Sequence, residues 1–238
     1  MLIDVQGVSH TFDAGTPSAH TVLRDVTVQL TQRRIGVIGH NGSGKSTFVR
    51  MLDALIVPTV GRVVVDGCDT AKQAAQVRRR AGFLFTDPDD QIIMPTVRED
   101  VAFGLRRLKL GKDEAAARVD AQLARFGLTR CADQPAHLLS GGQKQVLALA
   151  AVLITEPDLL IMDEPTTLLD LRNAHMFADL IADLRQTIVL ATHNLELVGG
   201  FARVLCFHQG RLVADGEPGE VIAQYRELMA KPYGVDDL

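Results

Sequence analysis

Apolar and polar residues partly alternate along the first third of the chain, which is the period of strands with one buried face. The pattern predicts strands over 2–8 and 22–30, with a polar loop at 14–18 between them. A short apolar run at 34–38 predicts another strand that leads into a glycine-rich turn. The spacing that follows predicts a helix over 45–55.

The middle of the chain has helical spacing instead. Apolar residues recur every three or four positions over 96–108 and again over 113–126, which predicts two helices. Asp113 is the expected N-cap of the second helix, and Gly127 is its expected stop. A further helix is predicted over 143–153.

Strands and helices alternate again in the last third. We expect strands over 159–162 and 187–191, a helix over 171–184 between them, and a hairpin formed by 204–207 and 211–214. Strands that alternate with helices predict an α/β fold with a mostly parallel sheet and helices on both faces.

The whole chain, 1–238, is expected to form one domain. Residues 87–136 are predicted to be a helical subdomain within it, joined by a helix over 140–155. Residues 224–238 should add only a short helix and a polar end.

Composition narrows the class of protein. Apolar residues make up 47% of the chain and charged residues 23%, and the formal net charge of -4 gives no bulk attraction to nucleic acid. The longest apolar run, 146–154, is too short to span a bilayer, and no signal peptide is visible at the start. Cys68, Cys131 and Cys206 form no CxxC pair, which favours a reducing compartment over a disulfide framework.

A phosphate-binding pattern follows the predicted strand at 34–38 and opens the predicted helix. It matches GxxxxGK[ST], and its residues are Gly39, His40, Asn41, Gly42, Ser43, Gly44, Lys45, Ser46 and Thr47. Glycines let the backbone approach phosphate oxygens, Lys45 would reach the β- and γ-phosphates, and the Ser46 hydroxyl would bind Mg²⁺. The alternative, a glycine-rich turn with an incidental lysine, is disfavoured by the flanking strand and helix.

Two carboxylates end the apolar strand predicted at 159–162. Asp163 would hold Mg²⁺ and Glu164 would act as general base on the attacking water. Taken alone, a solvated strand end would be the better interpretation. The other nucleotide motifs, in the expected chain order, favour the catalytic one.

A second glycine-rich turn, Leu139–Gln143, begins the helix predicted over 143–153. Its serine, two glycines and amide present backbone N–H groups at a helix N-terminus, where anions are favoured.

Together these motifs resemble those of ATP-binding cassette (ABC) ATPases, and the resemblance covers 2–223. It implies a P-loop NTPase (RecA-like) core with an antiparallel β edge, ATP and Mg²⁺ as ligands, and a dimer. In the family the Leu139–Gln143 motif binds the ATP of the partner subunit, which assigns Ser140, Gly141, Gly142 and Gln143 that role. The resemblance also makes His193 the switch histidine at the γ-phosphate and Asp170 the D-loop aspartate, although Asp170 could equally be a helix N-cap.

Two positions depart from the family pattern. Thr86 stands where a glutamine usually contributes to the Mg²⁺ site; its shorter reach makes direct metal contact doubtful and leaves a water-bridged contact as the alternative. Phe12 stands near the usual adenine-stacking tyrosine, and a core role is an equal alternative.

The segment 86–92 is similar to a short helix in the ATPases of energy-coupling factor (ECF) importers, where it meets the membrane partner. This likeness assigns partner coupling to Pro88, Asp89 and Gln91, although the same residues are also ordinary turn formers. The hairpin at 210–218 resembles that of importer ATPases.

The resemblance therefore implies an ATPase that powers import of a vitamin or transition-metal ion, with biotin or cobalt favoured. It would be a homodimer or a paired ATPase subunit, peripheral on the cytoplasmic face of the cell membrane, and would not insert into the membrane itself. Its partners would be an integral-membrane coupling protein and a substrate-binding membrane protein. It would not bind nucleic acid. The alternatives are another class of ABC importer or a soluble DNA-repair or chromosome-type ABC ATPase, whose long coiled coils do not occur here.

Overall fold

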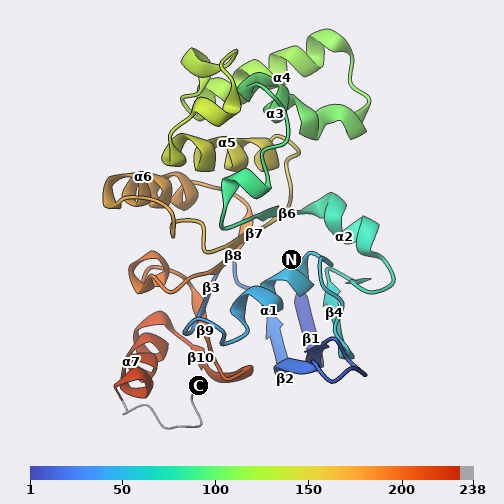
Figure 1. The fold of residues 1–238 in the computed structure, drawn as a ribbon, viewed down its shortest axis with the longest axis vertical. Coiled ribbons are helices and arrows are strands. Elements are labelled where there is room, and N and C mark those ends of the chain that lie inside the picture. Colours follow the sequence, from blue (N-terminus) through green and yellow to red (C-terminus); the bar gives the residue numbers. More distant parts are fainter. Residues whose placement is uncertain (231–238) are drawn as a thin grey trace. The chain divides into compact units, whose positions relative to one another are not determined.

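The computed structural model describes residues 1–230, and its chain forms two compact units. Of the described residues, 1–78 and 187–230 form one unit, and 79–186 form the other. Most of the helices and strands of the two units are labelled in Figure 1.

The first unit contains an antiparallel sheet in the order β2-β1-β4-β5. In this sheet Ile3 pairs with Leu30 on one side and with Val65 on the other, and all three are buried. The alternation in the sequence therefore reflects one buried face. The strands are β1 (Ile3–Phe12), β2 (His20–Leu30), β4 (Val60–Val65) and β5 (Cys68–Asp69).

A second group of strands in this unit positions the phosphate loop. The central strand, β3, pairs in parallel with β8 and β9, and β10 adds an antiparallel edge to β9. Helix α1 packs on β8, and α7 packs on β9 and β10. The elements are β3 (Arg34–Ile38), α1 (Lys45–Leu52), α2 (Ala74–Arg80), β8 (Thr187–Ala191), β9 (Arg203–His208), β10 (Arg211–Gly216) and α7 (Pro218–Met229).

The second unit combines two parallel strands with four helices. Leu84 of β6 pairs with Met162 of β7, so the carboxyl ends of the two strands lie side by side. Helix α3 packs against α4 and α5, which lie together in the ribbon of Figure 1. The elements are β6 (Ala81–Leu84), α3 (Val97–Phe103), α4 (Lys112–Arg125), α5 (Gly141–Leu153), β7 (Leu159–Asp163) and α6 (Leu171–Ala182).

Most predicted elements are present, with differences at their ends. Helix α1 ends three residues earlier than predicted, because Asp53 caps it and Ala54 takes a left-handed φ of 56°. The helix predicted over 96–108 is α-helical only to Phe103 and continues as a 3₁₀ turn, Gly104–Leu108. A Cβ at Gly104 would lie 3.0 Å from a side-chain carbon of Ile154, so this residue allows close packing beside the end of α5.

The predicted N-cap of α4 is wrong. Gly111 is the N-cap, and Asp113 lies inside the first turn, where its carboxylate still favours the helix dipole. The predicted stop is confirmed, because Gly127 has a φ of 69° just beyond the helix. The helix expected in the tail begins earlier, at Pro218, and residues 231–238 of that tail lie outside the described residues.

Candidate functional site

The loop between β3 and α1 has the backbone of a phosphate cradle. Gly39, Gly42 and Gly44 have φ values of 151°, 80° and 100°. A Cβ at Gly39 would lie 2.3 Å from the carbonyl oxygen of Phe207, so a side chain there would collide with β9. Glycine is therefore required by both conformation and space. The buried hydroxyl of Ser43 has no hydrogen-bond partner among the described residues, which suits a site that receives a polar ligand.

Lys45 provides the positive charge of this loop. It is the first residue of α1 and is 5% exposed, and its Nζ donates to the carbonyl oxygens of Gly39 at 2.7 Å and His40 at 3.0 Å. The ammonium is thus held inside the loop. Its field also reaches Cys206 on the neighbouring strand, where burial raises the thiol pKa to about 11 and the charge of Lys45 opposes that rise.

The structure brings His193 to the same edge of the sheet as the phosphate loop. Val37 of β3 pairs with Ala191 of β8 in parallel, and the amide of Thr192 donates to the carbonyl of Val37 at 3.0 Å. The two strands therefore end together, and His193 is exposed just beyond them. The roles predicted for His193 and for the loop residues stay predictions.

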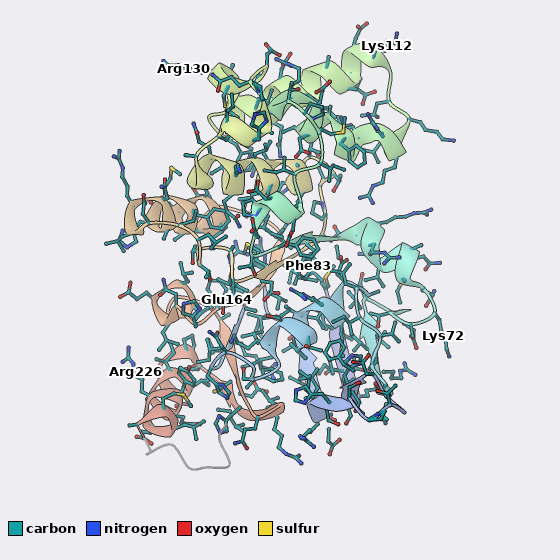
Figure 2. All side chains as sticks on the ribbon, viewed as in Figure 1. Lys72, Phe83, Lys112, Arg130, Glu164 and Arg226 are labelled. Carbon is teal, nitrogen blue, oxygen red and sulfur yellow. The ribbon has the colours of Figure 1, made fainter. Side chains whose placement is uncertain are left out.

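In the second unit, Asp163 and Glu164 follow directly at the end of β7. The Asp163 side chain is fully buried at 0% exposure, whereas Glu164 (labelled in Figure 2) takes a left-handed φ of 51°. Thr167 donates its hydroxyl to a Glu164 carboxylate oxygen at 3.2 Å. Left-handed non-glycine residues are uncommon and cost about 1 kcal/mol or more, and they cluster at functional sites.

Thr86, which replaces the usual glutamine, uses its hydroxyl within the second unit. The hydroxyl donates to the main-chain oxygen of Asp163 at 2.8 Å, which links the ends of β6 and β7. Gln91 accepts from the amide of Phe85 at 3.1 Å and donates to the carbonyl of Phe83 (labelled in Figure 2) at 3.3 Å. Both side chains thus fasten the segment between them to β6 and β7. Sequence reasoning missed the Thr86 contact, because it joins residues that are distant in the chain.

The signature turn, which we define as Ser140–Gln143, begins α5 with a capping box. Ser140 is the N-cap and accepts from the amide of Gln143 at 3.3 Å, while the Gln143 side chain accepts from the amide of Ser140 at 2.9 Å. Gly141 and Gly142 occupy the first two helical positions, whose amides have no partner inside a helix. These two amides are the donors that this turn can offer to an anion.

The loop after Glu164 leads to α6, which packs on the signature turn within the same unit. Asp170 is the N-cap of α6 and accepts from the amide of Asn173 at 2.8 Å. A Cβ at Gly142 would lie 2.7 Å from the Asn173 side chain, so α6 and α5 can approach only because this residue is glycine. The N-cap interpretation of Asp170 is confirmed, and its D-loop role stays a prediction.

The core alternative for Phe12 is wrong. Phe12 ends β1 with 40% of its surface exposed, and its ring contacts that of His10 edge to face at a centroid distance of 4.5 Å. Burial lowers the pKa of His10 below its usual value, so this supporting ring is neutral at pH 7. The stacking role of Phe12 stays a prediction.

A glycine-rich turn between a strand and a helix that begins with a buried lysine defines a P-loop nucleotide-binding protein. Comparison with known families extends this result, because residues 23–167 match the family model described as ABC transporter. The chain therefore belongs to the ABC transporter ATP-binding family. Its members bind ATP and hydrolyse it to power transport, so the expected enzyme class, an ATPase, is confirmed.

Similar proteins agree with this assignment. The chain is 51% identical over 212 residues to a biotin transport ATP-binding protein, BioM, from Rhizobium etli, covering 89% of this chain and 94% of that protein. It is 38% identical over 242 residues to the energy-coupling factor transporter ATP-binding protein EcfA1 of Caldanaerobacter subterraneus, covering 99% and 87%.

A solved structure confirms the expected fold class. It is cbiO1 from Clostridium perfringens, described as part of the ABC transporter complex cbiONQ. The two chains share 32% sequence identity and superpose with a TM-score of 0.81, covering 95% of this chain and 92% of that one. Within residues 1–230, no helix has the length and apolar character needed to cross a membrane.

Proposed function

We propose that this protein is the ATP-hydrolysing subunit of an ECF-type importer for a vitamin or transition-metal ion, with biotin or cobalt as the favoured cargo. The observation that carries the proposal is the 51% identity, over nearly the full length of both chains, to a protein named for biotin transport. The similarity to an ECF ATP-binding protein supports the same class of importer.

In this proposal the phosphate loop holds the nucleotide. Lys45 contacts the β- and γ-phosphates in place of its present bonds to loop carbonyls, and the glycine backbone wraps the phosphate oxygens. The exposed ring of Phe12 is available to stack on adenine. The other loop residues contribute mainly backbone amides.

The residues present fit a Mg²⁺ ion, which prefers oxygen ligands and uses few protein groups together with substrate phosphates. The Ser46 hydroxyl in the first turn of α1 and the buried carboxylate of Asp163 are such ligands. The ion would neutralise phosphate charge. The Thr86 hydroxyl donates to the main chain of Asp163 and so helps to position this ligand.

Hydrolysis is assigned to Glu164 and His193. Glu164 accepts the proton of the attacking water, and its left-handed backbone and the Thr167 hydroxyl orient the carboxylate. His193 steadies the γ-phosphate and the water.

We place the second half of each ATP site on a second ATPase subunit. The signature turn contributes the amides of Gly141 and Gly142, with Asp170 beside it, to ATP bound by the other copy. Because ATP contacts both copies only when they are closed, its binding favours the closed dimer. A membrane partner that docks on the segment carrying Pro88, Asp89 and Gln91 then converts closure into movement of the cargo.

The catalytic proposal is tested with Glu164→Gln. With ATP and Mg²⁺, turnover should fall by about 10²-fold or more, because a general base contributes on that order, and the protein should run as a dimer in light scattering. Glu220→Gln, in the exposed first turn of α7, is the matched control and should behave as the parent protein. A Glu164→Gln protein that stays monomeric with unchanged turnover would refute the shared-site mechanism.

The cargo is tested separately. The ATPase should co-purify with integral membrane partners, and the ligand released from the substrate-binding partner can be identified by mass spectrometry. Biotin or cobalt would support the proposal. Another cargo would leave the ATPase mechanism intact, and absence of any membrane partner would contradict the importer assignment.

A further inference from the structure

An ion pair joins the first turn of α5 to the turn Pro88–Asp90. The Nζ of Lys144 lies 2.7 Å and 2.9 Å from the two carboxylate oxygens of Asp89. The Lys144 side chain is only 16% exposed, whereas that of Asp89 is 63% exposed. The mostly buried Lys144 side chain thus pairs with the solvent-exposed carboxylate of Asp89.

The position of Lys144 conflicts with local helix preferences. Its amide makes the first helical bond of α5, to the carbonyl of Ser140 at 2.8 Å, so a cation stands at the positive end of the helix dipole. No acidic residue occurs in this first turn. Asp89, 55 positions earlier, offsets the unfavourable charge, and conflicts of this kind are expected where function requires them.

The segment that carries Asp89 is fastened at its other contacts. Asp87 caps the turn by accepting from the amide of Asp89 at 2.9 Å, and Pro88 is buried. Thr86 holds the main chain of Asp163, and Gln91 holds the end of β6. A displacement of this segment would therefore act on Asp163 through Thr86 and on the signature turn through Lys144.

We propose that Lys144 and Asp89 form a coupling ion pair, which positions the signature turn according to the position of the turn Pro88–Asp90. This inference rests on the proposed function, because the force on the turn comes from the membrane partner. Lys144 is a positioning residue and does not itself contact the nucleotide. A purely stabilising pair is the competing explanation, and it predicts no change in the stimulation of ATP turnover by the partner.

The experiment is a double-mutant cycle in the complete membrane complex. Lys144→Met keeps the aliphatic stem, Asp89→Asn keeps the shape, and both are combined in one chain. The measured quantity is the ratio of partner-stimulated to unstimulated ATP turnover, together with the KM for ATP. Arg118→Met, which breaks the exposed Arg118–Glu114 pair within α4, is the matched control.

Each single variant should lower the stimulation ratio about fivefold to tenfold, and the double variant should be no worse than either, because residues in one interaction are not additive. The KM for ATP should change less than about twofold. Lys144→Arg, which keeps the positive charge, should keep the stimulation ratio of the parent protein. The control Arg118→Met should leave it unchanged. If Lys144→Met does not fold, Lys144→Gln takes its place in the cycle.

Two results overturn the inference. Single variants with the stimulation ratio of the parent protein show that the pair does not couple the two turns. Losses that multiply in the double variant show that Asp89 and Lys144 act independently of each other. If the parent protein itself shows no stimulation by a membrane partner, the proposed function fails first, and the coupling role of the pair fails with it.

Discussion

The phosphate loop and the signature turn both place glycines at the start of a helix, yet they prepare their amides in opposite ways. The phosphate loop has no side-chain cap on α1; Gly44 at its N-cap takes a φ of 100°, and the buried Lys45 supplies charge. In the signature turn, Ser140 has an ordinary extended backbone and closes a capping box with Gln143.

This difference indicates different functions: the phosphate loop can bind an anion by itself, whereas the signature turn can only complete a site. An open loop with a buried cation can bind a polyphosphate by itself, since backbone amides and the ammonium are both directed inward. A capped turn has already satisfied two of its donors and carries no charge of its own in the box. Its two remaining amides can add a weak contact to an anion that other residues bind. This agrees with the proposed role of the turn in the ATP site of the partner subunit.

The largest effect should follow from loss of the phosphate-loop cation. We expect Lys45→Ala to weaken ATP binding about 100-fold or more, because a charge-assisted contact to phosphate is worth about 1.5–3 kcal/mol and the lysine makes several. Ser140→Ala should leave the affinity within about threefold and lower only turnover. Fluorescent-nucleotide titration measures both, and equal losses of affinity would erase the distinction between the two turns.

Substitution of His193, like substitution in the signature turn, should lower turnover and leave ATP affinity nearly unchanged. This is expected although His193 lies at the edge of the phosphate-loop sheet. His193→Ala should retain ATP affinity and lose about 10²-fold in phosphate release, since it assists chemistry and not binding. His175→Ala on the exposed face of α6 is the control. Near-normal turnover in His193→Ala would remove this residue from the mechanism.

The two signature glycines should differ in stability. A Cβ at Gly142 meets Asn173 at 2.7 Å, whereas a Cβ at Gly141 has its nearest neighbour, the carbonyl oxygen of Leu168, at 3.9 Å. Gly142→Ala should therefore lower the free energy of unfolding by about 1 kcal/mol, while Gly141→Ala should be neutral or slightly stabilising. Denaturant unfolding measures the difference, and Asn173→Ala should reduce the Gly142→Ala loss. Equal behaviour of the two glycines would show that α6 does not constrain the turn.

The smallest effect concerns Asp100, which supports the segment after Gln91. Its buried carboxylate accepts from the amides of Ile93 and Met94, both at 3.0 Å, and burial raises its pKa above the ordinary value while these bonds oppose the rise. A folded-state pKa above the unfolded one means that ionised Asp100 lowers stability at neutral pH, and that this penalty disappears as the pH falls through the folded pKa.

Asp100→Asn keeps the accepting oxygen and removes the buried charge. At pH 7 it should raise the free energy of unfolding, and this gain should shrink as the pH falls toward 4. A stabilisation that does not change with pH would contradict the desolvation argument.

Local sequence signals predicted most of the candidate site. The phosphate loop, the acidic end of β7 and the signature turn were predicted from spacing, because each is a continuous strand–turn or turn–helix segment with its own chemistry. Asp113 shows where such signals fail: any acidic residue near a helix start favours the dipole, so the sequence alone did not distinguish the N-cap from the first turn.

The sequence by itself determined the family and the residues available for phosphate binding, since close backbone approach, a lysine and paired carboxylates are written into contiguous motifs. Only the tertiary structure decided what Thr86, Phe12 and Lys144 contact. The Thr86 hydroxyl meets Asp163, Phe12 is exposed, and Lys144 pairs with Asp89. These outcomes depend on which distant segments pack together, and no local propensity encodes a contact between residues more than fifty positions apart.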